Sequence, residues 1–232
     1  MMKKQIPNII TLLNLSCGCV AILLATKGHL KEAAIMVLLA SVFDFFDGLA
    51  ARILHVKSNT GKELDSLADM VSFGVAPAAM MYCLYLGTGI CTYCLYDIFI
   101  IPALLSILFP CFVALRLAKF NLDARQTEIF YGLPSPAAAF VLVSFAFFAH
   151  NTYSFFVYTV VILFLCVFML ANVPLLSLKF KNFSLGNNIF RYILVCAGIV
   201  LIILLQFRSV PFIILTYVIL SLIHNIITKR NH

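Results

Sequence analysis

Four of the nine acidic residues of this chain lie within 26 positions, in a stretch that is otherwise strongly apolar. Asp44 and Asp47 are three residues apart, and Asp65 and Asp69 are four apart, so each pair lies on one face of a helix. Carboxylates are costly in a membrane, at about 2.5 to 3.5 kcal/mol each at a helix centre. Hard oxygen ligands suit Mg²⁺ or Mn²⁺, and four of them are enough for two ions. We therefore expect the two pairs to converge on a site for two divalent metal ions.

An alternative use of buried membrane acids is ion pairing or proton relay, as in a transporter for cations or protons. Arg52 is the one nearby basic residue on the segment that carries Asp44 and Asp47. Because one Arg cannot compensate four Asp, the metal site is the favoured interpretation and the transporter remains the alternative.

Small residues accompany the acids and leave room for a ligand. Gly48 and Ala51 leave the backbone open next to Asp47, and Gly61 lies in the short connection between the two acidic segments. Arg52 can add a forked contact to phosphate. A two-metal site of this kind holds a diphosphate and stabilises charge on the attacking and leaving oxygens of a displacement at phosphorus.

The complete run, Asp44-x2-Asp47-Gly48-x2-Ala51-Arg52-x8-Gly61-x3-Asp65-x3-Asp69, resembles the signature of the CDP-alcohol phosphatidyltransferases without a departure. The resemblance implies that the four Asp bind two metal ions and that Asp69 is also the general base for the acceptor hydroxyl. It further implies contacts to the CDP moiety from Gly48, Arg52 and Ser58, and we also expect Ala51 and Gly61 to contact the CDP-lipid.

The start of the first expected helix, Pro7-Asn8-x2-Thr11, is also similar to that family, in which these positions contact the nucleotide. Simple capping of the helix by Asn8 and Thr11 is the alternative interpretation.

Two later segments are expected on the metal side of the membrane, one from Arg116 to Asn121 and one from Gly132 to Pro136. Arg116 could hold a carboxylate in a bidentate pair. The early turn after Pro134, beginning with Ser135, offers unpaired N–H groups that suit an anion. Ordinary snorkelling of Arg116 and Lys119 to the headgroup region is the alternative.

Together with the run from Ser66 to Pro77, these segments resemble the membrane-spanning phosphatidylserine synthases of the family, over about residues 6–140. The resemblance implies CDP-diacylglycerol as donor, L-serine as acceptor, CMP as leaving product, and Arg116 and Asn121 near the amino acid. Glycerol 3-phosphate or an inositol phosphate would need a more cationic pocket, although composition alone leaves these acceptors open.

The elements that position these residues are expected to be membrane helices. The chain is 63% hydrophobic and 11% charged with a mean hydropathy of +1.08, far from the composition of soluble domains. Its apolar runs are too long and continuous for the strands of a membrane barrel. We therefore predict an all-α, polytopic transmembrane bundle of about eight helices. The expected ranges are 8–26, 31–54, 64–86, 96–117, 133–150, 154–175, 188–206 and 210–228.

The distribution of charge predicts the orientation of this bundle. With both termini in the cytoplasm, 13 of the 16 Lys and Arg residues fall on the inner side, and Lys27, Lys31 and Arg208 fall outside. The net charge of +7 then reflects this asymmetry and not a nucleic-acid partner. We expect an uncleaved first helix and an active site that faces the cytoplasm. We also expect one catalytic domain (core about 6–150, further helices about 154–228) and assembly as a homodimer.

Overall fold

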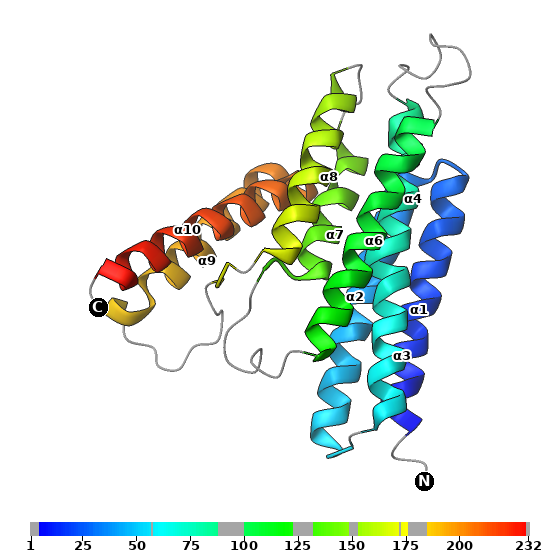
Figure 1. The fold of residues 1–232 in the computed structure, drawn as a ribbon, viewed down its shortest axis with the longest axis horizontal. Helices are drawn as coiled ribbons and strands as arrows, with labels where there is room; N and C mark the ends of the chain where they lie inside the picture. Colours follow the sequence, from blue (N-terminus) through cyan, green and yellow to red (C-terminus); the bar gives the residue numbers. More distant parts are fainter. Residues whose placement is uncertain are drawn as a thin grey trace.

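The computed structural model describes residues 5–56, 58–87, 100–122, 132–148, 153–171, 173–175 and 185–230. These residues are almost entirely helical, so the predicted all-α class is confirmed. Figure 1 shows four long rods, α1, α2, α3 with α4, and α6, running side by side, with α7 and α8 packed next to them. The last two helices, α9 and α10, form a hairpin that leans away from this bundle (Figure 1).

The structure describes nine α-helices, and three shorter segments next to them are π-helical or 3-10. The π-helical segment η2 (Met70–Val75) joins α3 to α4, and the 3-10 segments η4 (Phe145–Phe147) and η5 (Gln206–Ser209) follow α7 and α9. The α-helices are α1 (Gln5–Thr26), α2 (Leu30–Ile53), α3 (Asn59–Asp69), α4 (Ala76–Gly87), α6 (Ile100–Leu122), α7 (Ser135–Ser144), α8 (Ser154–Leu170), α9 (Leu185–Leu205) and α10 (Val210–Arg230).

Five segments are long and apolar enough to cross a membrane by length and composition. They are Gln5–Thr26, Leu30–Ile53, Asn59–Gly87, Leu104–Leu122 and Ile189–Asn225. Two more apolar helices, Ser135–Phe147 and Ser154–Leu170, are shorter. The expected number of eight spanning helices is therefore not confirmed in the described residues, and the cytoplasmic position of both termini stays a prediction.

Several helix boundaries differ from those expected. The third helix begins at Asn59 and not near 64, because the Ser58 hydroxyl caps it by accepting a hydrogen bond from the Gly61 N–H at 2.9 Å. The fourth continues to Leu122, so the run from Arg116 to Asn121 is helical. The sixth ends at Leu170, ahead of the expected 175. Residues 96–99, 149–150 and 172 of the expected ranges lie outside the described residues.

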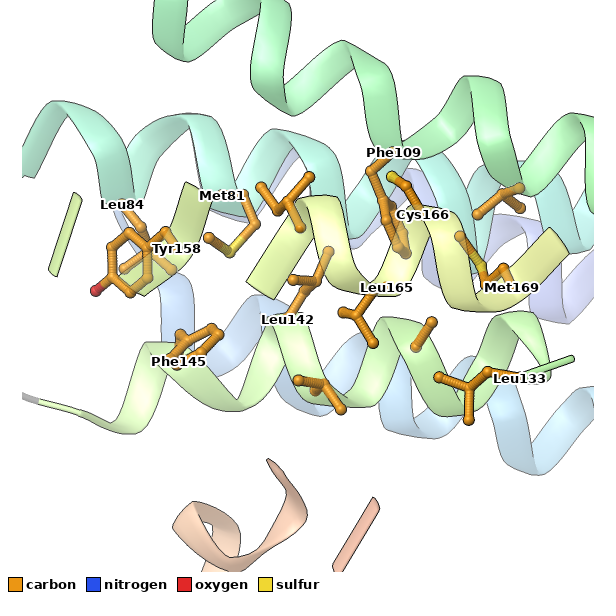
Figure 2. Packing of buried hydrophobic residues seen from close by; sticks show 14 of the residues in the cluster. Met81, Leu84, Phe109, Leu133, Leu142, Phe145, Tyr158, Leu165, Cys166 and Met169 are labelled. Carbon is orange, nitrogen blue, oxygen red and sulfur yellow. The ribbon is translucent and has the colours of Figure 1, made fainter. Parts of the chain in front are cut away.

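The main apolar cluster lies between α4, α6, α7 and α8. Figure 2 shows Met81 and Leu84 of α4, Phe109 of α6, Leu142 of α7 and Tyr158 of α8 directed into this space, and all are buried. This packing holds α4, α6, α7 and α8 together.

A second cluster, between α1, α2, α4 and α7, consists largely of alanines. Ala21 and Ala25 of α1 and Ala33 and Ala34 of α2 are fully buried. Small side chains allow helix backbones to approach closely inside a membrane. They bring α1 against α2, and this contact places the start of α1 beside the acidic end of α2.

The turn that precedes α7 is fixed by backbone contacts to the end of α8. Gly132 has a φ of +74°, and an added Cβ would lie 3.0 Å from the Ala171 carbonyl oxygen, so only glycine fits. The Gly132 N–H donates to the Val173 carbonyl at 3.0 Å, and the Leu133 N–H donates to the Phe168 carbonyl at 3.3 Å. The start of α7 is therefore held in place by α8.

Candidate active site

The acidic residues meet where α2 and α3 face each other. One carboxylate oxygen each from Asp44, Asp47 and Asp65 lies within 4.8 Å of the others. Asp69 lies one turn further along α3, about 6 Å by helix rise, next to the π-helical η2. It is outside the group of three. The structure thus brings three of the four predicted ligands together and puts the fourth beside them.

The chemistry of this group fits a cation. Among the described residues, no Lys, Arg or His forms an ion pair with any of the four carboxylates. Asp47 is 6% exposed, and the Asp65 Oδ1 atom is buried without a hydrogen-bond partner. Buried anionic oxygens without compensation are costly, and hard divalent ions bind oxygen ligands of this type. These residues can therefore hold divalent metal.

Thr11 of the first helix donates a hydrogen bond to one of the acids. The Thr11 hydroxyl lies 2.6 Å from Asp47 Oδ2 and 3.0 Å from the Pro7 carbonyl oxygen, and its single proton is shared between these acceptors. Because α1 is already helical at Gln5, Thr11 lies inside the helix. The interpretation of Thr11 as a helix cap is therefore wrong, and its hydroxyl orients a predicted metal ligand.

A cavity of about 410 Å³ opens beside the acids. Six of the seven predicted CDP-lipid contacts line it, and Arg52 does not, because its Nε donates to the Gly48 carbonyl at 3.0 Å at the exposed surface. The lining residues are Pro7, Asn8, Thr11, Asp47, Gly48, Ala51, Val56, Ser58, Asn59, Gly61, Lys62 and Asp65. The predicted diphosphate contacts and two of the acids therefore share one cavity.

Gly61 is required by a close approach in this cavity. A Cβ at this position would lie 2.9 Å from the Ser58 hydroxyl oxygen and 3.2 Å from Asn8 Oδ1. The first turn of α3 thus reaches α1 at a point where a side chain would collide with the capping serine.

Arg116 is buried on α6, with 8% of its surface exposed. Its Nε donates to the Leu133 carbonyl at 2.6 Å, and its guanidinium lies 5.9 Å from the centroid of the Phe120 ring. Asp69 acts on it electrostatically. The snorkelling interpretation is therefore wrong for Arg116, whereas Lys119 is exposed as that interpretation expects.

The end of α6 is bound to α3 near the acids. The Asn121 Nδ2 donates to the Ser66 hydroxyl at 2.8 Å, and the Lys62 Nζ donates to the Asn121 carbonyl at 2.9 Å. Pro134 and the buried Ser135 begin α7 directly after Leu133, the partner of Arg116. The four predicted acceptor contacts, Arg116, Asn121, Pro134 and Ser135, do not line the 410 Å³ cavity. Arg116 and Asn121 lie on α6, whose end is hydrogen-bonded to α3, and Pro134 and Ser135 lie at the start of α7.

Asn14 is a residue of the site that the sequence interpretation missed. Its side chain is completely buried, and its Nδ2 donates to Asp69 Oδ1 at 3.2 Å. It follows Thr11 by three positions, so both lie on one face of α1. A polar residue in register with Thr11 inside an apolar helix was the signal that could have found it.

Ser72, in the π-helical η2, was missed too. Its hydroxyl donates to the Asn14 carbonyl at 3.0 Å, across 58 positions of the chain. A Cβ on Gly18 would collide with the Ser72 hydroxyl, so α1 approaches η2 only because glycine is present. π-helical turns are frequent at functional sites. Here the turn follows Asp69 directly and is fastened to the helix that contacts Asp69.

These features define a class of protein, and comparison with known families agrees. Residues 4–175 match the CDP-alcohol phosphatidyltransferase family, and the chain belongs to this family. The match covers α1 to the end of α8 and ends before α9. The predicted family resemblance is therefore confirmed.

Three relatives of this chain carry enzyme names, and two of these names are the same. The chain is 36% identical over 144 residues to the CDP-diacylglycerol–serine O-phosphatidyltransferase of Bacillus subtilis, covering 62% of this chain and 76% of that protein. It is 34% identical over 181 residues to the enzyme of the same name from Helicobacter pylori, with coverages of 77% and 72%. It is also 37% identical over 145 residues to the archaetidylserine synthase of Methanothermobacter thermautotrophicus, with coverages of 60% and 57%.

The membership and the helices together indicate an integral membrane enzyme. Five apolar segments are long enough to span a membrane, and the family is one of phosphatidyltransferases. The family match thus supports the predicted class of enzyme, and the apolar segments support its association with lipid.

Proposed function

We propose that this protein transfers the phosphatidyl group of CDP-diacylglycerol to the hydroxyl of L-serine, giving phosphatidylserine and CMP. The observation that carries the proposal is the convergence of Asp44, Asp47 and Asp65 within 4.8 Å, beside a cavity built from the family's motif residues. The names of the relatives support serine as the acceptor.

In this proposal the 410 Å³ cavity receives the CDP diphosphate. Asn8 and Ser58 offer polar side chains there, and Gly48, Ala51 and Gly61 leave space for the ligand. Lys62 brings a positive charge to the rim. Two divalent ions, Mg²⁺ or Mn²⁺, bound by Asp44, Asp47, Asp65 and Asp69 would neutralise the diphosphate and make its phosphorus more electrophilic.

Asp69 is the proposed general base. It accepts the proton of the serine hydroxyl while the serine oxygen forms a bond to the phosphorus that carries diacylglycerol. The bond from that phosphorus to the oxygen of CMP breaks, and CMP leaves with the electron pair. The Asn14 Nδ2 donates a hydrogen bond of 3.2 Å to Asp69 Oδ1 and so orients the carboxylate. Direct attack is favoured, because the Ser and His residues of the Asp44–Asp69 motif do not offer an obvious nucleophile. Ser58 caps α3, Ser66 is hydrogen-bonded to Asn121, and His55 is exposed.

The serine carboxylate is proposed to bind near Arg116. The Arg116 Nε donates a hydrogen bond to the Leu133 carbonyl. This bond fixes the plane of the guanidinium and leaves its terminal N–H groups for a planar anion. Asn121 and the Ser135 N–H at the start of α7, directly after Pro134, complete the proposed acceptor contacts.

The orientation and assembly of the enzyme are also proposals. The excess of basic residues on the side of the acids supports an active site that faces the cytoplasm. A homodimer is proposed because the symmetric dimer is the commonest form among oligomeric proteins.

The test is a transfer assay with the purified protein in mixed micelles. CDP-diacylglycerol, labelled L-serine and Mn²⁺ or Mg²⁺ are expected to give labelled lipid and CMP in equal amounts, and a chelator is expected to stop both. Glycerol 3-phosphate and an inositol phosphate are tested in parallel. Label in lipid from one of these and none from serine would replace the acceptor.

A matched pair of variants separates the metal site from general charge effects. Asp65→Asn is expected to remove transfer, whereas Glu63→Gln, an exposed acid two residues earlier on α3, is expected to leave it intact. Equal rates in the two variants would contradict the proposed role of the acidic cluster.

A further inference from the structure

We propose that the protein has a second anion-binding site, at the end of the bundle opposite the acids. This site binds the headgroup of an anionic glycerophospholipid. It is a cavity of about 430 Å³ lined by Lys31 and Arg208 together with Phe147, Leu204, Leu205, Gln206 and Phe207. Lys31 lies 13 residues before Asp44 on α2, which is about 20 Å by helix rise. The cavity is therefore separate from the active site.

Its charge favours a phosphate group. Lys31 and Arg208 are two of the three basic residues that the charge distribution predicts on the outer side of the membrane. Among the described residues, neither forms an ion pair. The neighbouring acid, Glu32, lies 3.9 Å from His29 and does not line the cavity. Two uncompensated cations facing one space bind an anion, and phosphate suits an Arg with a Lys.

Arg208 is held in position before any ligand binds. Its Nε donates to the Phe147 carbonyl at 2.6 Å, and its guanidinium lies 5.9 Å from the centroid of the Phe148 ring. The hydrogen bond uses the Nε of the Arg208 guanidinium and leaves its terminal N–H groups for an anion. A preorganised side chain loses less conformational entropy on binding.

The backbone is also shaped to make this cavity. Between α9 and α10 the chain reverses through η5, and Gln206 has a φ of +51°, an uncommon conformation for a residue other than glycine. The buried Ser209 hydroxyl donates to the Gln206 carbonyl at 2.5 Å, and Phe207 stacks on Phe147 with centroids 4.8 Å apart. The reversal brings Arg208 of the hairpin to the end of α7, opposite Lys31 of α2.

The remaining walls decide which phosphate compound fits. Leu204, Leu205, Phe147 and Phe207 are apolar, and the side chain of Leu204, near the end of α9, is 71% exposed. A free phosphate or a soluble polyphosphate would meet cations on one side and hydrocarbon on the other. A lipid satisfies both, since its phosphate meets Lys31 and Arg208 and its acyl chains continue along α9.

The experiment measures lipid binding to the purified full chain in detergent. Phosphatidylglycerol, phosphatidylcholine and sodium phosphate are titrated separately, and binding is followed by the rise in the midpoint of thermal unfolding. A phosphatidylglycerol with a photoreactive headgroup then maps the site by mass spectrometry of the cross-linked peptide. We expect stabilisation by phosphatidylglycerol, little by the other two compounds, and cross-links at residues 204–208 in addition to any in the active site.

The variant Lys31→Gln/Arg208→Gln is expected to weaken this binding about tenfold for each lost charged contact and to lose the cross-link at 204–208. Lys27→Gln, an exposed basic residue at the same end that does not line the cavity, is the matched control and should bind as the unaltered chain does. Lys31→Gln alone keeps the contact from Arg208 to Phe147, so it tests the cavity even if the double variant does not fold.

Three results would overturn the proposal. They are equal binding by Lys31→Gln and the unaltered chain, equal weakening by Lys27→Gln, and stabilisation by sodium phosphate equal to that by phosphatidylglycerol. Serine incorporation should be unchanged in Lys31→Gln, because the cavity is remote from the acids. The outcome is therefore independent of the proposed transfer reaction.

Discussion

The helix from Asn59 to Gly87 and the hairpin from Ile189 to Asn225 are both apolar enough to lie in a membrane, yet the protein uses them differently. In the apolar stretch of the first segment, 56% of the residues are buried within the protein. In the apolar stretch of the hairpin, 11% are buried. The first carries Asp65, Asp69 and Ser72 and contacts α1, α6 and α7. The family match ends at residue 175, before the hairpin. Packing within the protein thus accompanies the chemistry, whereas the hairpin presents apolar surface to lipid.

The largest expected effect is at Asp69, in the buried segment. Asp69→Asn should lower the turnover number roughly a thousandfold, since a general base commonly contributes a factor of this order. Binding of CDP-diacylglycerol should be partly retained, because the cavity residues are unchanged. The measurement is steady-state transfer together with equilibrium binding of the donor. Normal turnover in this variant would refute the assignment of the base.

Next in size is the contrast in packing between the core of the bundle and the hairpin. Leu142→Ala, in the fully buried cluster, should lower the free energy of unfolding by about 2 to 5 kcal/mol. Ile203→Ala in α9, where the side chain is 73% exposed, should lower it by less than about 0.5 kcal/mol. Denaturant unfolding in one detergent measures both. Similar losses would show that the hairpin is packed as tightly as the bundle.

Asn14→Ala tests the contact that α1 makes with the base. The variant removes the hydrogen bond to Asp69 and keeps the backbone carbonyl that Ser72 uses. A hydrogen bond to a charged group is worth about 1.5 to 3 kcal/mol, so turnover should fall about ten- to a hundredfold with little change in the KM for CDP-diacylglycerol. Ser16→Ala, at an exposed position on the same helix, is the control. A loss seen only in KM would contradict a role in positioning Asp69.

The smallest effects come from a pair of glycines. Gly18→Ala forces a Cβ against Ser72, whose Cα would be 2.9 Å away, and should destabilise the protein by about 1 to 3 kcal/mol. Gly198→Ala in α9 meets no atom within 4 Å and should be neutral or stabilising by up to about 1 kcal/mol. Thermal unfolding compares the two. Destabilisation by Gly198→Ala would show a contact on the hairpin that the structure does not contain.

The sequence was sufficient for the fold class and for the convergence of the acidic residues Asp44, Asp47 and Asp65, because both depend on local spacing. Asp44 with Asp47 and Asp65 with Asp69 share helix faces by periodicity alone, and a short connection makes their helices neighbours. The number of spanning helices was not predictable in the same way. Segments such as Ser135–Phe147 are apolar but short, and hydropathy does not show where an apolar helix ends inside a bundle.

Only the tertiary structure decided what depends on contacts between distant residues. Arg116 could be a snorkelling side chain or a buried one, and its bond to Leu133 exists because the turn before α7 is fixed to α8. Asn14 meets Asp69 because alanines and Gly18 let α1 approach α2 and η2. Lys31 and Arg208 face one cavity because the chain reverses at Gln206. Periodicity assigns a residue to a face of its helix, whereas side-chain packing determines which other helix that face meets.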